Sequence, residues 1–281
     1  MLDPAGRVLV TRTIPTLLVS EQLGDRPLPQ RLSTNIGPRG LTVNFYSRIV
    51  AVDIFGSNGV IHGVDSIILP PPDILKIISL LPSEFSTLEL GLAKTGLLDE
   101  LNGTHAGGTF FAPSNFAFQK LGPRINAFLF SSYGLKYLKA LLTYHVVKEG
   151  HTLYSDAYYK PGSGEEKIFG CSHHKARAMD GEHHGPPKGF FAVTLPTMLE
   201  DKSLDINIAR FGRLIDIRIN GFSHVVVSDG VASDGVIQVV GDVLIPPKQL
   251  GEQSSNEDLT VEVLKERLEP YVQEDKGWFD L

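Results

Sequence analysis

The spacing of hydrophobic residues changes near residue 73. Before that point the chain carries short β-branched runs separated by Gly, Pro and Asn: "RVLV", "PTLLVS", "LTVNFY" and "RIVAVDIF". These runs predict strands, and no long helical pattern lies among them. Residues 73–144 instead show helical spacing in "DILKIISLL", in "EFSTLELGLAKT", which Gly96 is expected to end, and in "SYGLKYLKALLTY". In the last run Leu135, Leu138 and Leu142 recur at helical intervals, so this helix is expected to face a core.

Strands are predicted again in the C-terminal part of the chain. The runs are "KGFFAVTLP", "SLDINIARF", "RLIDIRING", "HVVVSDG" and "GVIQVVGDVLIP". A block of helices followed by a block of strands favours an α+β fold over a doubly wound parallel sheet. Near the end, "LTVEVLKERLEPYV" predicts a short amphipathic helix that Pro270 ends.

One segment of the chain occurs twice. "SNGVIHGVDSIILPPP" (residues 57–72) returns 176 residues later as "SDGVIQVVGDVLIPPK" (residues 233–248), with seven identical positions. In each copy a Gly-containing turn leads into a β-branched run that a Pro pair stops, which is typical of a strand. A repeat at this spacing indicates tandem domains rather than a solenoid with units of ~20 to 50 residues. We expect residues 33–72 and 203–247 to form related β units.

The repeat divides the chain into three parts. Residues 1–72 are expected to form a β-rich half-domain, residues 73–250 a complete domain with a helical first half, and residues 251–281 a polar tail. The complete domain contains a Gly-, Pro- and His-rich insertion near residues 160–188. We expect residues 171–188 of it to be mobile and exposed, because polar Gly/Pro-rich sequence buries little apolar surface.

Composition argues against two classes of partner. The 281 residues are 42% hydrophobic, which allows a sizeable core, and the formal net charge is −6 with Lys and Arg scattered. Nucleic-acid binding is therefore not expected. Prolines and charges break the longest apolar stretch, "SIILPPPDILKIISLL", short of the ~20 residues that a transmembrane helix needs. No transmembrane segment is expected, and the first residues show no recognisable signal peptide.

The stretch "GTFFAPSNFAFQKL" places a hydroxyl at a strand-to-helix corner, where some hydrolases keep their nucleophile. Ser114 lacks the flanking glycines of the Gly-x-Ser-x-Gly elbow, since its neighbours are Ala112, Pro113, Asn115 and Phe116. Ser114 or Asn115 can instead accept a hydrogen bond from an N–H at the start of the next helix. The sequence favours a helix cap, and we expect no catalytic residue.

Five side chains in the insertion invite a metal site: Cys171, His173, His174, His183 and His184. Thiolate and imidazole suit zinc or copper, but no C-x-x-C or H-E-x-x-H spacing is present. Adventitious metal binding is therefore favoured over a specific site, and neither a metal nor a cofactor is expected. The glycines of "GSNG" and "SDGVASDG" belong to turns rather than to a phosphate loop.

Three motifs together resemble the fasciclin domain: "NGVIHGVDSIILPPP" with its second copy, "TFFAPSNFAF", and "LLTYHVV". The resemblance covers residues 74–250 as a complete domain and residues 7–72 as the C-terminal half of another. It marks five residues as partner contacts or structural positions: Asp53, Ile54, His62, Tyr144 and His145. From the residues alone, His145 is favoured as a hydrogen-bonded structural histidine at a helix-to-strand corner.

The chain also departs from the family pattern. Gln238 stands where the first copy has His62, and Asp229 and Gly230 stand where it has Asp53 and Ile54. Residues 1–72 lack the N-terminal motif and the helices of a fasciclin domain, which fits either a truncated sequence or a degenerate half-domain.

The resemblance implies a non-enzymatic adhesion or matrix protein that binds a protein or a cell-surface or cell-wall glycan. The alternative is a non-catalytic accessory subunit of an extracellular or vacuolar oxidoreductase complex in fungal polyketide pigment biosynthesis; an enzyme in its own right is a third class. The family implies an extracellular or cell-surface location, with the vacuole as alternative. Asn102 begins an N-glycosylation sequon that the sequence places in a loop after a helix.

Overall fold

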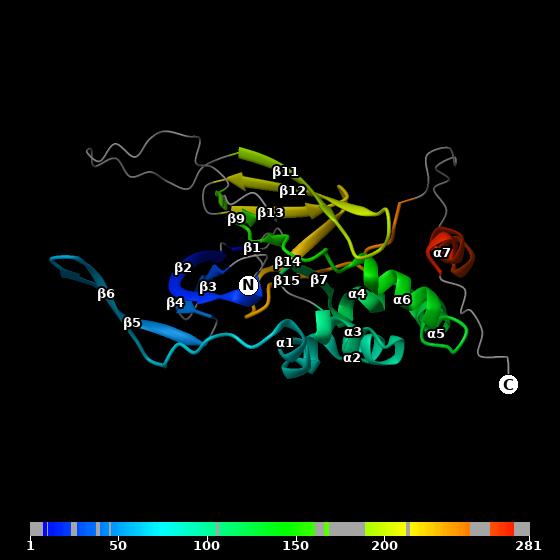
Figure 1. The fold of residues 1–281 in the computed structure, drawn as a ribbon, viewed down its shortest axis with the longest axis horizontal. Coiled ribbons are helices and arrows are strands. Elements are labelled where there is room, and N and C mark those ends of the chain that lie inside the picture. Colours follow the sequence, from blue (N-terminus) through cyan, green and yellow to red (C-terminus); the bar gives the residue numbers. More distant parts are fainter. Residues whose placement is uncertain are drawn as a thin grey trace.

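The computed structural model describes residues 8–9, 11–23, 27–37, 40–44, 46–104, 107–160, 166–168, 189–211, 214–247 and 259–272. Most helices lie between residues 74 and 144 and most strands before or after that segment, so the predicted α+β class is confirmed. The helices gather beside a large sheet, while one hairpin extends from the opposite end of the molecule (Figure 1). Among the described residues no helix is long and apolar enough to cross a membrane.

The helical half contains six helices among the described residues. They are α1 (Ile74–Leu80), α2 (Pro82–Thr95), α3 (Leu97–Thr104), α4 (Asn115–Lys120), α5 (Gly122–Leu129) and α6 (Leu135–Tyr144). The Asp73 carboxylate begins α1 by accepting the Lys76 N–H at 2.7 Å. Gly96 ends α2 with a φ of +72°, the left-handed conformation that glycine adopts without strain. The three long helical patterns in the sequence are thus confirmed.

The main sheet has the order β11-β12-β13-β14-β15-β7, and β1 (Val8–Leu9) pairs with β13 off this path. Its other strands are β7 (Thr109–Pro113), β11 (Gly189–Pro196), β12 (Ser203–Phe211), β13 (Leu214–Ile219), β14 (Ser223–Val231) and β15 (Val236–Val240). Neighbouring strands are antiparallel except for the parallel pair β15 and β7. The helical half therefore contributes one strand to the sheet of the second half.

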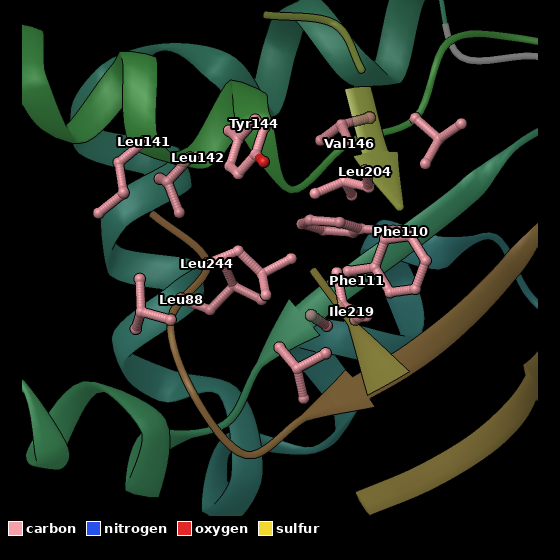
Figure 2. Packing of buried hydrophobic residues seen from close by; sticks show 14 of the residues in the cluster. Leu88, Phe110, Phe111, Leu141, Leu142, Tyr144, Val146, Leu204, Ile219 and Leu244 are labelled. Carbon is pink, nitrogen blue, oxygen red and sulfur yellow. The ribbon is translucent and has the colours of Figure 1, made fainter. Parts of the chain in front are cut away.

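The core lies where β7 and the helices meet the sheet (Figure 2). Phe110 and Phe111 of β7 are at most 1% exposed, and they lie among Leu88 of α2, Leu142 of α6 and Leu204 of β12. Each buried aliphatic or aromatic side chain of this size contributes about 1.5–3 kcal/mol to the hydrophobic term. The two halves of the domain thus share one core and are expected to fold together.

A second, five-stranded sheet precedes the helices, with the order β2-β3-β4-β5-β6. Its elements are β2 (Thr11–Ser20), η1 (Glu21–Leu23), β3 (Leu28–Gly37), β4 (Gly40–Val43), β5 (Ser47–Gly56) and β6 (Gly59–Val64). All of its neighbouring strands are antiparallel. The hairpin of β5 and β6 is the one that extends away from the body in Figure 1.

The remaining elements are short. A three-stranded sheet joins β8 (Thr152–Leu153), β9 (Ala157–Tyr159) and β10 (Glu166–Ile168). The predicted C-terminal helix is α7 (Val261–Leu268), followed by η2 (Glu269–Tyr271), so the α-helix ends before Pro270, which lies in the 3-10 turn. Leu264 and Leu268 of α7 are fully buried, and the Tyr137 hydroxyl bonds Glu269 at 2.5 Å.

Candidate functional site

Ser114 is a helix cap. Its backbone is extended, with φ −70° and ψ 164°, and its Oγ accepts the Ala117 N–H at 3.2 Å at the start of α4. Asn115 does not share this role, because its Oδ1 accepts the Thr87 N–H at 2.9 Å and joins α4 to α2. The predicted cap is confirmed, and of the two residues that the sequence left open it is Ser114 that caps α4.

Tyr144 and His145 lie inside the protein at the end of α6, each 0% exposed. The Leu244 N–H donates to His145 Nε2 at 2.9 Å, so the ring proton is on Nδ1 and is donated to the Leu141 carbonyl at 2.8 Å. Burial lowers the pKa of His145 to about 4. The Tyr144 hydroxyl accepts from Asn220 Nδ2 at 2.9 Å, and burial raises its pKa. Both rings connect the helical half to loops of the sheet.

The two sequence copies adopt the same strand pairing. In β5 and β6, Ile49 pairs with Val64 and Ala51 with Gly63, followed by Ile54 with Ile61 and Phe55 with Val60. Adding 176 to each number gives pairs found in β14 and β15: Val225↔Val240, Val227↔Val239, Gly230↔Ile237 and Val231↔Val236. Even the two register shifts fall at the same places. Because the pairing extends beyond the repeated sequence, from here on the first copy means residues 46–71 and the second copy means residues 222–247.

The shared bulge has the same internal support in both copies. Asp53 and Asp229 are the equivalent residues, with left-handed φ values of 57° and 61°. The Asp53 N–H donates to His62 Nδ1 at 3.3 Å, and the Asp229 N–H donates to Gln238 Oε1 at 3.1 Å. Histidine and glutamine therefore fill one structural role, which explains how Gln238 replaces the histidine of the first copy.

The second copy is covered by the helical half of its domain. The Val236 N–H donates to the Gly108 carbonyl at 3.0 Å as β15 joins β7. Gln238 Nε2 donates to the Leu153 carbonyl at 2.8 Å, and the Ser155 N–H donates to Asp229 Oδ1 at 2.7 Å. Burial, with the nearby charge of Asp156 as a smaller cause, raises the pKa of Asp229 to about 6.

The first copy carries the same features without that cover. β6 is an edge strand within the described part of the chain, and Asp53, Ile54 and His62 are exposed. Apolar side chains that are buried in one copy are exposed in the other. The exposed fractions are 79% for Phe55 against 5% for Val231, 62% for Ile61 against 2% for Ile237, and 82% for Ile67 against 5% for Val243. Structure thus separates the candidate residues into a buried pair, Tyr144 and His145, and an exposed group on the hairpin.

A polar cluster that the sequence did not indicate joins the five-stranded sheet to the three-stranded sheet. The Arg31 guanidinium of β3 is 4% exposed and donates to the Tyr159 hydroxyl at 2.8 Å and to Thr13 Oγ1 at 2.6 Å. Asp156 lies 3.6 Å from the guanidinium, which also faces the Tyr154 ring. This arginine fixes the five-stranded sheet to residues 154–159.

A groove of about 770 Å³ lies elsewhere, between α6, the turn at residues 198–200 and η2. Three of its charged side chains contact one another or an aromatic ring: Lys139 pairs with Glu100 at 3.1 Å, and Lys136 lies 5.1 Å from the Tyr137 ring centre. None of the three exposed candidate residues, Asp53, Ile54 and His62, lines this groove.

The Asn102 sequon lies in a different element from the one predicted, and the predicted metal-binding segment lies outside the described residues. Asn102 belongs to α3 rather than to a loop, because Leu97 and Leu101 bury one face of a helix that continues through the sequon; its own side chain lies outside the described residues. The Cys171 and His-rich segment, with its predicted mobility and metal affinity, also lies outside them. Where the structure describes the chain, no cluster of three or more His, Cys, Asp or Glu side chains could hold a metal ion.

Comparisons with known proteins agree with the motifs. The fasciclin domain family model matches residues 83–246. Aurofusarin biosynthesis cluster protein S of Gibberella zeae is 31% identical over 242 residues, which is 81% of this chain and 56% of that protein. Stabilin-2 of Rattus norvegicus is 28% identical over 160 residues, covering 50% of this chain and 11% of that protein. The chain thus spans about half the length of the first relative and a small part of the second.

One solved structure is also similar: a FAS1 domain pair from the insect cell adhesion molecule Fasciclin I. It aligns with a TM-score of 0.47 and 18% identity, over 84% of this chain and 71% of that chain.

Proposed function

This chain belongs to the fasciclin domain family, and on that premise we propose that it is a non-enzymatic interaction protein that binds another protein through its first copy. The observation that carries the proposal is the apolar surface of the β5–β6 hairpin. Seven large apolar side chains on the hairpin and two on the segment that follows it are at least 38% exposed: Val50, Val52, Ile54, Phe55, Val60, Ile61 and Val64, and then Ile67 and Leu69. Exposed apolar surface of this extent marks an interaction site in a soluble protein.

The chemistry of the hairpin favours a protein partner over a glycan. Sugar binding uses many hydrogen-bonding side chains, whereas this surface is aliphatic and aromatic, with Asp53 and His62 as polar groups beside the bulge. An edge strand also offers a row of backbone N–H and C=O groups that another strand can bind. Asp53, Ile54 and His62 are therefore proposed as partner contacts, and Tyr144 and His145 as structural residues.

A non-catalytic role fits the engagement of the motif side chains. Ser114 caps a helix, His145 bridges two backbone groups, and Asp229 accepts from Ser155. A general base must reach the substrate proton that it abstracts, and each of these groups instead bonds neighbouring chain inside the protein. Proteins of this family often act outside the cell, so we place the interaction at the cell surface or in the extracellular space, with the vacuole as alternative.

A second candidate function is narrower. The relative from Gibberella zeae is named as a biosynthesis cluster protein and matches 81% of this chain. This supports an accessory, non-catalytic role in the assembly of an oxidoreductase complex that makes a polyketide pigment. Deleting the gene in its own organism should then leave an unfinished pigment precursor, and a copy carrying Phe55→Ser and Ile61→Ser should fail to restore the product.

The interaction itself is tested by site-specific photo-crosslinking in cells that express the protein. A photoreactive phenylalanine at Phe55 (79% exposed) should give a discrete adduct with another protein, identified by mass spectrometry. The same residue at Phe190, which is 77% exposed but lies on β11, is the matched control. Equal labelling from both positions, or none from Phe55, would contradict the proposal.

A further inference from the structure

We propose that the open edge of β6 accepts a parallel strand from the helical half of a further fasciclin domain, a segment of the same kind as residues 74–160. This inference rests on the proposed function, because it names the partner of the same hairpin. It is drawn from the duplication inside the chain, since the second copy shows what the first copy is shaped to receive.

The backbone of β6 repeats the edge that β15 presents to β7. In the covered copy the Val236 N–H donates to Gly108, and the Val240 carbonyl accepts the Ser114 N–H at 3.3 Å. Because the two copies share one register, the equivalent groups are the Val60 N–H and the Val64 carbonyl. These groups lie on the side of β6 away from β5, where a parallel strand would reach them.

The side chains of the first copy are also suited to burial under a strand and helices like those that cover the second copy. Phe55, Ile61 and Ile67 are apolar at positions whose equivalents, Val231, Ile237 and Val243, are at most 5% exposed. A freely solvated hairpin gains nothing from apolar groups on these positions, whereas a strand and helices like those of the second copy would bury them. The apolar side chains at these three positions therefore indicate that another chain segment covers this face of the hairpin.

The two polar side chains of the bulge, His62 and Asp53, are placed to bond the same kind of partner. His62 Nδ1 accepts the Asp53 N–H, so neutral His62 carries its proton on Nε2. This places a donor where Gln238 Nε2 reaches the Leu153 carbonyl in the second copy. Asp53 likewise offers a carboxylate where Asp229 accepts from Ser155. Leu153 and Ser155, the partners in the second copy, both lie in the segment that follows α6, so the occupant supplies such a segment in addition to the strand that pairs with β6.

The occupant is a helical half carried outside residues 1–281. Within the chain β7 already pairs with β15, and its own residues Phe110 and Phe111 are buried in the core. A second copy of the chain could supply this strand only by opening its own core, at the cost of the burial seen in Figure 2. Self-association is thus a separate outcome of the test.

The probe is a synthetic peptide with the sequence of residues 108–115, GTFFAPSN, flanked by lysines for solubility and added to the full chain. Fluorescence anisotropy should show saturable binding that a scrambled peptide lacks. Hydrogen exchange should show new protection at residues 60–64. Val60→Pro removes the N–H at the free edge, where proline is tolerated in a strand, and should weaken binding by at least about tenfold, while Val60→Ala keeps that N–H and should bind as before.

His62→Gln copies the covered site and should bind within about threefold of the parent, since glutamine fills this role in the second copy. Absence of saturable binding, unchanged affinity of Val60→Pro with a native circular dichroism melt, or protection outside residues 60–64 would overturn the inference. So would a concentration-dependent dimer in sedimentation velocity that Val60→Pro abolishes, because the occupant would then be a second copy. If the crosslink at Phe55 persists while the peptide fails to bind, the interaction function stands and the identity of the partner is wrong.

Discussion

The Leu244 N–H donates to Nε2 of His145 across 2.9 Å, and this bond ties the end of α6 to the segment that follows β15. The opposite ring nitrogen bonds the Leu141 carbonyl, so the buried imidazole satisfies one donor and one acceptor of the backbone. The histidine of the Tyr-His pair thus joins the end of the last helix of the helical half to the segment after β15 from inside.

His145→Ala should lower the free energy of unfolding by about 2–4 kcal/mol, because it leaves a cavity and two buried backbone groups without partners. Urea denaturation at pH 7 measures the change. His224→Ala is the control, since His224 is exposed and pairs with Asp216 at the surface; it should change stability by about 0.5 kcal/mol or less. Equal effects of the two substitutions would contradict a structural role for His145.

The same histidine predicts an acid-sensitive fold. Its pKa is about 4 in the folded protein against 6.5 for the free side chain, so the folded state disfavours the proton. The stabilisation is complete above pH 6.5 and is lost as the pH falls toward 4. Subtracting unfolding energies of His145→Ala from those of the parent, measured from pH 7.5 to 4, should give a difference that shrinks with acid. A constant difference would mean that the ring is not held neutral.

Asp229→Asn tests a shift of opposite sign. Burial raises the pKa of Asp229 to about 6, so the folded state favours the protonated form, and its contribution is full below the unfolded value of 3.8 and lost as the pH rises through 6. Asparagine is neutral, tolerates the left-handed backbone at this position and still accepts the Ser155 N–H. At pH 7 the variant should therefore be at least as stable as the parent.

At pH 4 the parent should regain stability relative to Asp229→Asn, as measured by thermal unfolding at the two pH values. Asp229→Ala separates charge from geometry, because it removes the acceptor for Ser155 and should destabilise at both pH values by about 1–3 kcal/mol. A pH-independent gap between parent and Asp229→Asn would show that folding does not raise the pKa of Asp229.

Sequence patterns located the elements with strong periodicity and missed those held by distant contacts. The strand β3, "LPQRLSTNIG", reads as a polar stretch, yet Gln30, Arg31 and Ser33 are buried because each bonds a residue of another strand or segment. The helix α3 was missed because the sequon obscures the Leu97 and Leu101 face. The repeat was visible in the sequence, but the exposure of one copy depends on what covers it, and no local pattern encodes that.

Arg31→Ala should loosen the N-terminal sheet from the complete domain. The guanidinium is buried between Tyr154, Tyr159 and Asp156, and removing one partner of such a buried pair costs about 3–5 kcal/mol. Limited proteolysis should then release residues 1–72 earlier than in the parent. Arg48→Ala is the control, because Arg48 is about half exposed and pairs with Asp65 at the surface. Identical cleavage rates for both variants would show that other contacts hold the sheets together.

Ser114 provides the final prediction, which concerns both stability and reactivity. Because its Oγ accepts the Ala117 N–H, Ser114→Ala should cost about 0.5–2 kcal/mol, and Asn115 should not compensate while it bonds Thr87. Ser114→Asp restores an N-cap acceptor and should recover most of that loss. Ser114 is 5% exposed, so a fluorophosphonate probe should leave its hydroxyl unlabelled. Stoichiometric labelling of Ser114, together with esterase activity that Ser114→Ala abolishes, would instead establish a nucleophile, because a capping hydroxyl has no base to activate it.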